Sequence, residues 1–511
     1  GVTHVTSGTL AAGDENVFSA NSAHRVATGT LLDLQGFDQT VASLDNAGTV
    51  RLGGAPGTVL TVTGNYAGSA GVILVNTALG DDNSVTDRVV IGGNTSGTGS
   101  IKVTNIGGTG AQTNQGIRII DVADGSTSAA AFTLIGDYSF EGEQAVVGGA
   151  YAYRLYQNSP AGPDDGDWYL RSTLIPTGPD PLYQAGVPLY ETYPQLLAAF
   201  NRLGTLQQRV GNRSWSGNDG TVGVIDLGGR QVEAGGAWAR IEGAYAHDGL
   251  DTTSGGTTYD SSLWRLQAGM DGLVQHSEQD ALVAGAYVDY GVISADVASV
   301  FGSGSISTTG FGVGGTLTWY DADGLYVDGV AQLRWFDSSL HSTTADLDLV
   351  DGNGGLGLAL SVEAGRQVAL DGNWSITPQA QLVYSAVGFD DFTDAFGAAL
   401  RLNDGGGLTG RLGVTLDYDD SSEGDNGLER THWYGIANLY YELDNSTEIE
   451  VSGTALKAGA DQLSGELGVG GSYDWDDDKY SLYGEASVRT RLDDLGASYG
   501  LNGNLGMRIR W

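Results

Sequence analysis

The sequence contains no cysteine, which excludes several kinds of protein at once. Its 511 residues include Cys 0 and Met 2. Without thiols the chain has no disulfide scaffold, thiolate zinc site, iron–sulfur cluster or cysteine nucleophile. Basic residues are also scarce, because Lys+Arg 24 stand against Asp+Glu 62, for a formal net charge of −38. Lys and Arg are the residues that bind nucleic-acid phosphates, so we expect no nucleic-acid partner.

Long hydrophobic runs are absent as well. No stretch of about 18 apolar residues occurs, so we predict no transmembrane helix. The start, Gly1 to His4, lacks the basic and apolar regions of a signal peptide. We therefore expect a mature chain or a fragment of a longer one. A membrane β-barrel stays open, because its sequence signal is alternation and not continuous hydrophobicity.

Glycine is abundant, and the composition favours strands. The chain holds Gly 82 and is 41% hydrophobic. This apolar content excludes a disordered chain, and the glycines show no collagen period of three. Many Gly, Thr, Val and Tyr residues with few helix formers predict an all-β fold. The length predicts two or more domains.

Residues 1–175 are predicted to form a β-helical stem. Short β-runs follow one another with Gly, Asn and Asp between them and with no helical period. A parallel β-helix and a β-sandwich both fit this spacing. We favour a right-handed parallel β-helix, because its coils need Gly, Asn and Asp at their corners and tolerate imperfect repeats. The runs lie at 59–63, 72–76, 88–91, 101–105, 117–122, 132–135 and 151–156.

Residues 176–215 are predicted to hold a linker and one α-helix. Four of the chain's prolines (Pro 9) fall between Pro176 and Pro188, which indicates irregular structure. Apolar residues then recur at helical spacing, with Thr192 as a suitable cap and Pro194 near the first turn. We expect this helix to span about 194–212. Its apolar positions are Leu196, Leu197, Phe200, Leu203, Leu206 and Val210.

Residues 236–511 alternate strictly between apolar and polar side chains. In the last segment Leu505, Met507 and Ile509 share one face, and Arg508 and Arg510 share the other. Soluble strands average about 5–6 residues and membrane-spanning strands need about 9–11, and these segments match the longer class. Trp and Tyr also gather at the segment ends, as in the aromatic girdles of membrane barrels. We predict an antiparallel transmembrane β-barrel rather than a half-buried soluble sheet.

Twelve barrel strands are predicted, an even number as in bacterial single-chain barrels. Long and short connections mostly alternate, which places both barrel ends at the periplasmic side and the long loops outside. The connection 420–430 breaks this alternation, and 447–457 is expected to be a ribbon within a loop. The strands are expected near 237–247, 261–274, 280–293, 308–320, 324–337, 356–369, 373–386, 407–419, 431–443, 463–475, 479–490 and 499–511.

The polar face of these strands carries charges that we expect in the barrel lumen. Buried charges need partners, and the polar side of the helix offers them. We predict that the helix plugs the pore and that its arginines, Arg202 and Arg209, meet lumenal carboxylates such as Glu242, Glu466 or Glu485. The candidate residues of the pore helix and lumen are Arg202, Arg209, Arg240, Glu242, Glu466 and Glu485.

Other motifs are interpreted as structural. Dinucleotide-type patterns starting at Gly310 and Gly352 lie at or within barrel strands without the required helix, as does a nucleophile-elbow pattern at Gly496. The histidines (His 6) show no zinc spacing. The acidic run 474–478 is interpreted as a solvated turn, with a divalent-ion site as the alternative. We expect no catalytic residue, no cofactor and no metal, and hence no enzyme.

The whole chain resembles a monomeric (type V) autotransporter of Gram-negative bacteria, with the C-terminal part of a pertactin-like passenger. No single motif carries the resemblance, but their combination is specific. In the stem it rests on Gly-Thr-Val-Leu-Thr-Val-Thr-Gly-Asn-Tyr at 57–66 and on related motifs at 79–84, 86–90, 105–113, 151–155 and 167–170. In the remainder it rests on 203–211 in the helix, on Ala-Trp-Ala-Arg at 237–240 and on 503–511.

The resemblance implies a location and partners. The barrel is expected to be a monomer in the outer membrane, in contact with lipid and lipopolysaccharide. The family depends on periplasmic chaperones and on the barrel assembly machinery, which would recognise the C-terminal Trp511. The passenger would be threaded outward and anchored at the cell surface, with an autochaperone segment at about 40–175. No Asn-Asn or Asn-Asp pair occurs in 191–215, so we expect no self-cleavage in the helix.

Three other functions stay open. The stem could itself be a surface adhesin or structural surface protein, since its Gly, Thr, Asn and Asp surface suits protein or glycan contacts. An enzymatic passenger could lie upstream of this chain, although 1–190 shows no Ser/His/Asp set. A simple porin is disfavoured by the helix and by the long N-terminal region.

Overall fold

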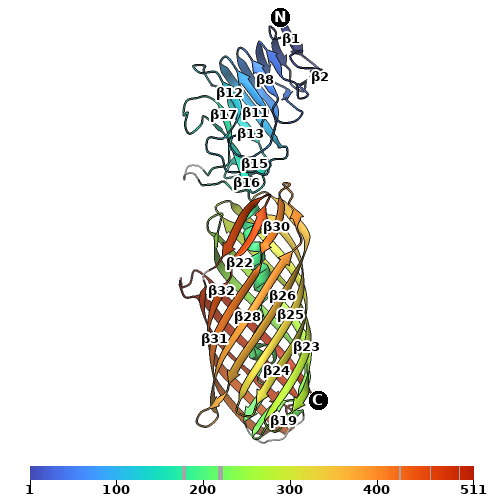
Figure 1. The fold of residues 1–511 in the computed structure, drawn as a ribbon, viewed down its shortest axis with the longest axis vertical. Helices are drawn as coiled ribbons and strands as arrows, with labels where there is room; N and C mark the ends of the chain where they lie inside the picture. Colours follow the sequence, from blue (N-terminus) through green and yellow to red (C-terminus); the bar gives the residue numbers. More distant parts are fainter. Residues whose placement is uncertain (175–179, 217–222, 425–426, 461, 494) are drawn as a thin grey trace.

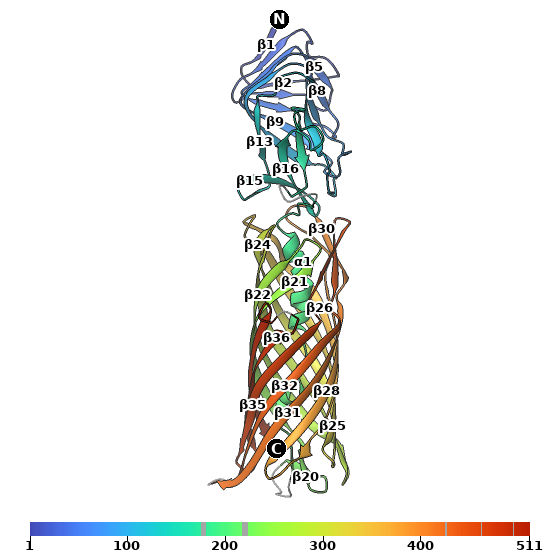
Figure 2. The same ribbon diagram turned by 90° about the vertical axis from the view of Figure 1, so that its left-hand side faces the viewer.

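The computed structural model describes residues 1–174, 180–216, 223–424, 427–460, 462–493 and 495–511. An elongated β-structure, called the stem here and made of residues 1–174, stands on one end of a long closed barrel (Figures 1 and 2). The N-terminus lies at the far tip of the stem, and the C-terminus lies at the opposite end of the barrel. Neither described helix is long and apolar enough to cross a membrane.

Most of the stem is a parallel solenoid, as predicted. Its strands are β1 (Val2–Val5), β2 (Thr9–Ala11), β3 (Ala23–Val26), β4 (Leu31–Asp33), β5 (Gln39–Val41), β6 (Ser43–Asn46), β7 (Thr49–Arg51), β8 (Val59–Val62), β9 (Tyr66–Thr77), β10 (Arg88–Ile91), β11 (Thr95–Asn105), β12 (Ile117–Val122) and β13 (Ala131–Ile135). Strands of successive coils pair in parallel, for example β3 with β6 and β8 with β10. Leu44, Leu60 and Val89 point inward and are fully buried, so alternate residues of each short strand build the core.

The base of the stem differs from the prediction. The remaining strands are β14 (Tyr138–Phe140), β15 (Glu143–Gly148), β16 (Tyr151–Gln157) and β17 (Trp168–Arg171). They pair antiparallel, and β17 adds antiparallel to β12, so the run at 151–156 is not a further coil. The ring of Trp168 meets that of Phe132 edge-on at 5.4 Å, and Phe132 lies 5.5 Å from Tyr66. The antiparallel cap thereby closes a core that another open coil would leave exposed.

The predicted helix is two helices. They are α1 (Val187–Phe200) and α2 (Leu206–Val210). The cap of α1 is Gly186 and not Thr192, which lies inside the helix and donates from Oγ1 to the backbone O of Pro188 at 2.8 Å. Thr205 caps α2 in a capping box with Gln208, and Gly211 ends it at φ 70°. The prolines misled the sequence interpretation, because Pro188 lies in the first turn of α1 and Pro194 lies in its interior.

The barrel has twelve long strands in one closed antiparallel sheet, which confirms the predicted number and fold class. The twelve are β21 (Gly235–Thr252), β22 (Thr257–His276), β23 (Asp280–Ser299), β24 (Gly302–Asp321), β25 (Leu325–Ser342), β26 (Leu347–Arg366), β28 (Trp374–Phe389), β31 (Gly406–Gly424), β32 (Gly427–Asp444), β35 (Leu463–Trp475), β36 (Tyr480–Arg491) and β37 (Tyr499–Arg510). The first strand pairs with the last in continuous register, from Gly236 opposite Arg510 to His247 opposite Tyr499. Apolar side chains such as Leu412 and Trp433 point outward, while Arg334 is fully buried inside.

Most strands run beyond the predicted ends, whereas β35, β36 and β37 match their predicted bounds to within one residue. At the stem end, β21 and β22 are separated by 253–256 alone, so the predicted long loops are largely extended hairpins. Shorter strands complete the chain: β18 (Ser214–Ser216), β19 (Val224–Asp226), β20 (Arg230–Glu233), β27 (Val368–Ala369), β29 (Phe392–Thr393), β30 (Ala399–Asp404), β33 (Thr447–Val451) and β34 (Thr454–Gly459). The last two form the ribbon predicted at 447–457 and pair with β30 and β21.

One hydrophobic core joins the stem to the barrel. It contains Val147 of the stem base, Leu189 and Leu197 of α1, and Phe301 and Ile449 of the connections at the stem end. The Tyr183 ring meets Phe301 edge-on at 5.5 Å and stacks on Tyr151 at 5.5 Å. Figure 2 shows α1 inside the barrel close to the stem. The chain therefore enters the lumen through a packed apolar junction.

Candidate functional site: the occupied lumen

Glycines of the barrel wall make room for α1. A Cβ added at Gly310 would lie 2.7 Å from Cε1 of Phe200, and one at Gly304 would lie 2.8 Å from Cδ2 of Leu189. A Cβ at Gly357 would lie 2.7 Å from Oδ1 of Asn201. Gly310 and Gly357, which belong to the two dinucleotide-type patterns, thus serve close packing against the end of α1.

The end of α1 is fixed by polar contacts from the wall. The guanidinium of Arg334 donates to the backbone O of Phe200, lies 4.7 Å from its ring centroid, and pairs with Asp289 at 2.7 Å. A cation at this position complements the helix C-terminus. The Asn201 amide donates to the backbone O of Leu358 at 3.0 Å. These contacts hold the break between the two helices inside the barrel.

The two predicted helix arginines have other partners than we predicted. Arg209 forms a bidentate pair with Asp328, with N–O distances of 2.7 and 3.0 Å, and both side chains are buried. Arg202 lies 3.5 Å from Glu442 and is 57% exposed. Both arginines thus meet lumenal carboxylates, as predicted, but the named examples Glu242, Glu466 and Glu485 were wrong, because the strand register brings other carboxylates to these heights.

The other predicted residues nevertheless lie in the lumen. Glu242 pairs with Arg265 at 2.6 Å and with Arg240 at 3.5 Å. Two of them reach α2, because Arg240 donates to the backbone O of Gln208 at 2.7 Å and Glu485 accepts from its Nε2 at 2.7 Å. Glu466 accepts from Nδ2 of Asn438 at 2.9 Å. The last predicted residue, Trp511, follows β37 and is exposed.

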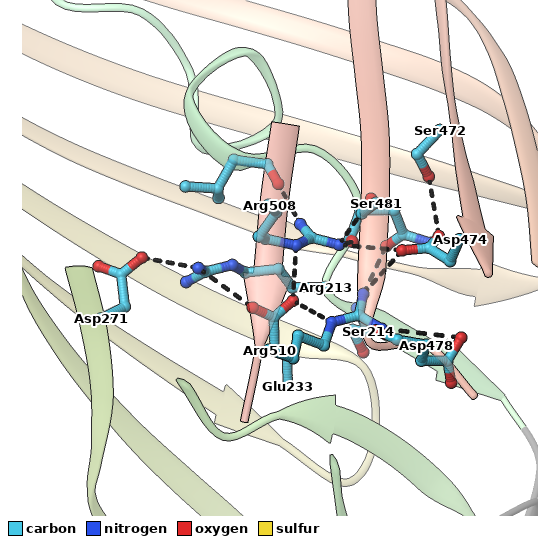
Figure 3. Close-up of polar contacts among 12 residues, drawn as sticks. Arg213, Ser214, Glu233, Asp271, Ser472, Asp474, Asp478, Ser481, Arg508 and Arg510 are labelled. Atoms are coloured by element: carbon cyan, nitrogen blue, oxygen red, sulfur yellow. Dashed lines mark hydrogen bonds and ion pairs between the residues drawn. The ribbon is translucent and has the colours of Figure 1, made fainter. Parts of the chain in front are cut away.

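A second ionic network, at the barrel end away from the stem, was missed. Figure 3 shows Glu233 surrounded by Arg213, Arg508 and Arg510, with N–O distances of 3.4, 2.9 and 3.0 Å. Arg213 also pairs with Asp271 at 2.6 Å. We call this group the Glu233 network; its members are Arg213, Glu233, Asp271, Arg430, Asp474, Asp478, Arg508 and Arg510.

The Glu233 network corrects the interpretation of the acidic turn. Asp474 lies 2.8 Å from Arg510, Asp478 lies 2.9 Å from Arg430, and both carboxylates are fully buried. They are therefore not part of a solvated turn. With four arginines and four carboxylates the network is formally neutral, as buried charges require. The sequence signal was the inward position of Arg508 and Arg510, but their partners come from distant segments.

The lumen is filled by the protein's own chain. A cavity of about 70 Å³ lies beside α2, with Arg230, Tyr326 and Asp417 among its lining residues. Among the described residues no group of three or more His, Asp and Glu side chains is placed to hold a metal ion. The arrangement suits a mechanical role, in which charged side chains of the barrel wall hold the segment inside the barrel through hydrogen bonds and ion pairs.

Comparison with known proteins identifies both parts of the chain. Residues 237–487 match the autotransporter beta-domain, and residues 40–155 match the type 1 autochaperone domain. The adhesin BmaC autotransporter of Brucella suis is 46% identical over 91% of this chain, and the uncharacterized protein YdeU of Escherichia coli is 31% identical over 90%. This chain spans 14% of the length of BmaC and 99% of that of YdeU.

A solved structure supports the same fold. The transport unit of the Escherichia coli autotransporter AIDA-I matches with a TM-score of 0.50 at 16% identity, over 63% of this chain and 99% of that chain. The stem contains the residues that match the autochaperone domain, and the twelve-stranded barrel contains those that match the beta-domain. The chain belongs to the autotransporter family.

Proposed function

We propose that the passenger of this autotransporter stays attached after secretion, so that the chain works as a permanent surface anchor. The observation that carries this proposal is that α1 and α2, which lie between the stem and β21 in the chain, are held in the lumen by Arg334 and Asp328 of the barrel wall. No Asn-Asn or Asn-Asp pair lies at the break between the helices, where Asn201 precedes Arg202.

Epitope tags on the stem and at an exposed barrel turn test this proposal. Cells that express the chain should show both tags on one polypeptide near 52.9 kDa in the outer membrane fraction. A stem fragment that carries only the first tag, in the medium or on the cells, would contradict permanent attachment.

Adhesion is the second candidate. It is favoured by the relative BmaC, an adhesin, but this chain spans 14% of that protein. We propose a non-enzymatic surface role, with adhesive contacts made by the stem or by further passenger sequence. Cells that display this chain should then bind host-cell surfaces better than cells that display a chain without residues 1–135; equal binding would place adhesion outside residues 1–135.

Biogenesis is proposed to follow the family route, with periplasmic chaperones, the barrel assembly machinery and lipopolysaccharide as partners. Support comes from Trp511, which follows the outward Ile509 at the free end of β37 and is 61% exposed. Replacing it by Ala should lower the yield of heat-modifiable barrel several-fold while leaving synthesis unchanged. An unchanged yield would show that Trp511 is not the recognised residue.

A further inference from the structure

The two ends of the barrel sequence meet at Glu233. This residue ends β20, two positions before β21 begins, and its side chain is fully buried. Its Oε2 contacts Nε of Arg508 and of Arg510, both on β37, while its Oε1 faces Arg213. Arg213 belongs to the stretch that follows α2, called the pore segment here together with α1 and α2 (residues 187–216). Glu233, which lies just before the first barrel strand, therefore contacts the last strand through Arg508 and Arg510 and the pore segment through Arg213 (Figure 3).

Arg508 depends on the pore segment for several of its contacts. It donates to the backbone O of Val210 and, at 2.9 Å, to that of Asn212. Its other partners are Glu233, Asp474 of β35 at 3.3 Å, and Oγ of Ser481 of β36 at 3.3 Å. A barrel that closed without the pore segment would lose both carbonyls, and Arg508 would keep only its partners on the wall and Glu233. Buried charges that lose partners are strongly disfavoured.

Trp215 of β18 adds a second link between the pore segment and the wall. The centroid of its ring lies 4.8 Å from Cζ of Arg510 and 5.0 Å from Cζ of Arg430. Trp215 is itself buried. Cation–π contacts of this kind are strongest where water is excluded, so Arg510 is linked both to Glu233 and to a ring of the pore segment.

The contact between β21 and β37 is the seam that closes the barrel. It joins segments at opposite ends of the barrel sequence, and contacts between such distant residues form against the largest loss of chain entropy. Arg510 and Arg508 lie opposite Gly236 and Trp238 at the end of this seam away from the stem. Interactions that form only when the seam closes therefore have the greatest influence on its formation.

We propose that Glu233, Arg213, Arg508 and Arg510 act as a closure latch, which makes pairing of β21 with β37 dependent on the pore segment being inside the lumen. The latch favours a barrel that closes around its own passenger connection over one that closes empty. This role in assembly goes beyond anchoring. A segment that only plugged the pore could enter a barrel that had already closed, whereas the latch requires the segment to be present when the barrel closes.

The absence of cysteine permits a direct test. In the full chain, Ala244→Cys with Asn502→Cys reports pairing across the seam, and Ser261→Cys with Ala295→Cys reports pairing of β22 with β23. Disulfides form in the oxidising periplasm, and pulse-labelled cells give the rate of each. Glu233→Gln should slow the seam disulfide roughly tenfold, because weakening contacts made in the closing step slows that step. The wall disulfide should keep its normal rate.

Asp289→Asn is the matched control. Asp289 is also fully buried and lies 2.7 Å from an arginine, Arg334, but both residues are on β23 and β25, away from the seam. Equal slowing of the seam by Asp289→Asn and Glu233→Gln, or no slowing by Glu233→Gln, would overturn the latch.

A milder variant covers the case in which Glu233→Gln yields no barrel. Arg213→Gln leaves both β37 arginines facing Glu233 and removes the ionic links of the pore segment to Glu233 and Asp271. It should slow the seam disulfide by a smaller factor than Glu233→Gln does. A seam rate equal to that of the unchanged chain would overturn the latch as proposed, because Arg213 is the member that links Glu233 to the pore segment.

Discussion

Buried carboxylates in this chain are satisfied in two different ways. In the stem, Asp87 accepts backbone N–H groups from Gly57, Thr58 and Asn76 at 3.0, 3.0 and 2.8 Å. Burial raises the pKa of its carboxyl group, with no cation among the causes. In the lumen, by contrast, carboxylates such as that of Asp328 face arginines. Backbone donors fix the corners of a solenoid, whereas ion pairs join separate segments of the chain.

Glu191 of α1 belongs to the first kind and makes the entry to the lumen sensitive to pH. Its carboxylate accepts from N and Oγ of Ser254 at 3.1 and 2.5 Å, in the turn between β21 and β22. Burial raises the pKa of Glu191 from the usual 4.5 to about 7. The folded state thus binds this proton more tightly than the unfolded state, and the stabilisation present below about pH 4.5 is lost as pH rises to about 7.

We expect local opening of α1 to become easier by roughly 3 kcal/mol between pH 4.5 and pH 7.5, since each pKa unit corresponds to about 1.4 kcal/mol. Amide hydrogen exchange of residues 187–193 and 252–256 measures this opening. Glu191→Gln should remove the pH dependence, after correction for intrinsic exchange. The same pH dependence in the variant would assign it to another group.

At the scale of elements, the base of the stem packs against the hairpins at the adjacent end of the barrel. Phe301, between β23 and β24, packs on Tyr183, and Phe396, between β29 and β30, lies 5.9 Å from Tyr138 of the stem. Asp394 accepts from the hydroxyl group of Tyr190 at 2.6 Å and from the Gln184 amide at 3.0 Å. Connections that looked like free loops in the sequence therefore contribute to the core.

Phe301→Ala should loosen this junction without opening the barrel. Truncating a buried Phe costs about 3–5 kcal/mol, so hydrogen exchange at 182–190 should rise by orders of magnitude while the heat-modifiable barrel band persists. Phe311→Ala is the control, because Phe311 faces outward and is 49% exposed. Equal exchange in the two variants would mean that Phe301 does not support the junction.

The sequence predicted elements where one physical rule dominated. Alternation from Leu505 to Ile509 follows from a wall with lipid on one side, so the twelve strands were predictable. The ends of the strands were not predictable, because beyond the membrane both faces of a hairpin are polar or packed and the alternation is lost. The start of α1 was not predicted because Pro188 indicated a linker. The antiparallel stem base was not predicted because the pairing direction of a strand leaves no signal in its sequence.

Ion-pair partners were the least predictable feature. The inward faces of Arg209 and Glu485 were correctly inferred from spacing, but a partner depends on the height at which each strand meets the helix. Arg209 meets Asp328 rather than Glu485 because of that register. The Glu233 network needs six separate segments to come together, and no local pattern encodes such a meeting.

At the scale of the whole molecule, charge and apolar surface are divided between regions. Residues 1–190 hold 7 basic and 17 acidic residues, and 191–511 hold 17 and 45. Several barrel charges are paired inside the lumen, and further acidic residues, such as Asp323 and Glu278, lie on exposed connections. The outward faces of the strands are left to apolar residues. The barrel thus has polar ends, an apolar belt and a charged interior that grips its own chain.

Deleting residues 191–212 should open the pore. The deletion removes the last ten residues of α1, all of α2 and the contacts to Arg334, Asp328 and Arg240, so the lumen loses the chain that fills it. Conductance of the purified protein in planar bilayers should rise several-fold over that of the full chain. The same conductance for both proteins would show that this segment does not plug the pore.

We expect the chain to cross the outer membrane, with its stem outside the cell and with the turns at the barrel end away from the stem in the periplasm. Single cysteines test it without background, at Val85, which is 57% exposed on the stem, and at Glu278 in the exposed turn between β22 and β23. A membrane-impermeant maleimide added to intact cells should label Val85→Cys and leave Glu278→Cys unlabelled until the outer membrane is permeabilised. Labelling of Glu278→Cys but not Val85→Cys on intact cells would contradict the account.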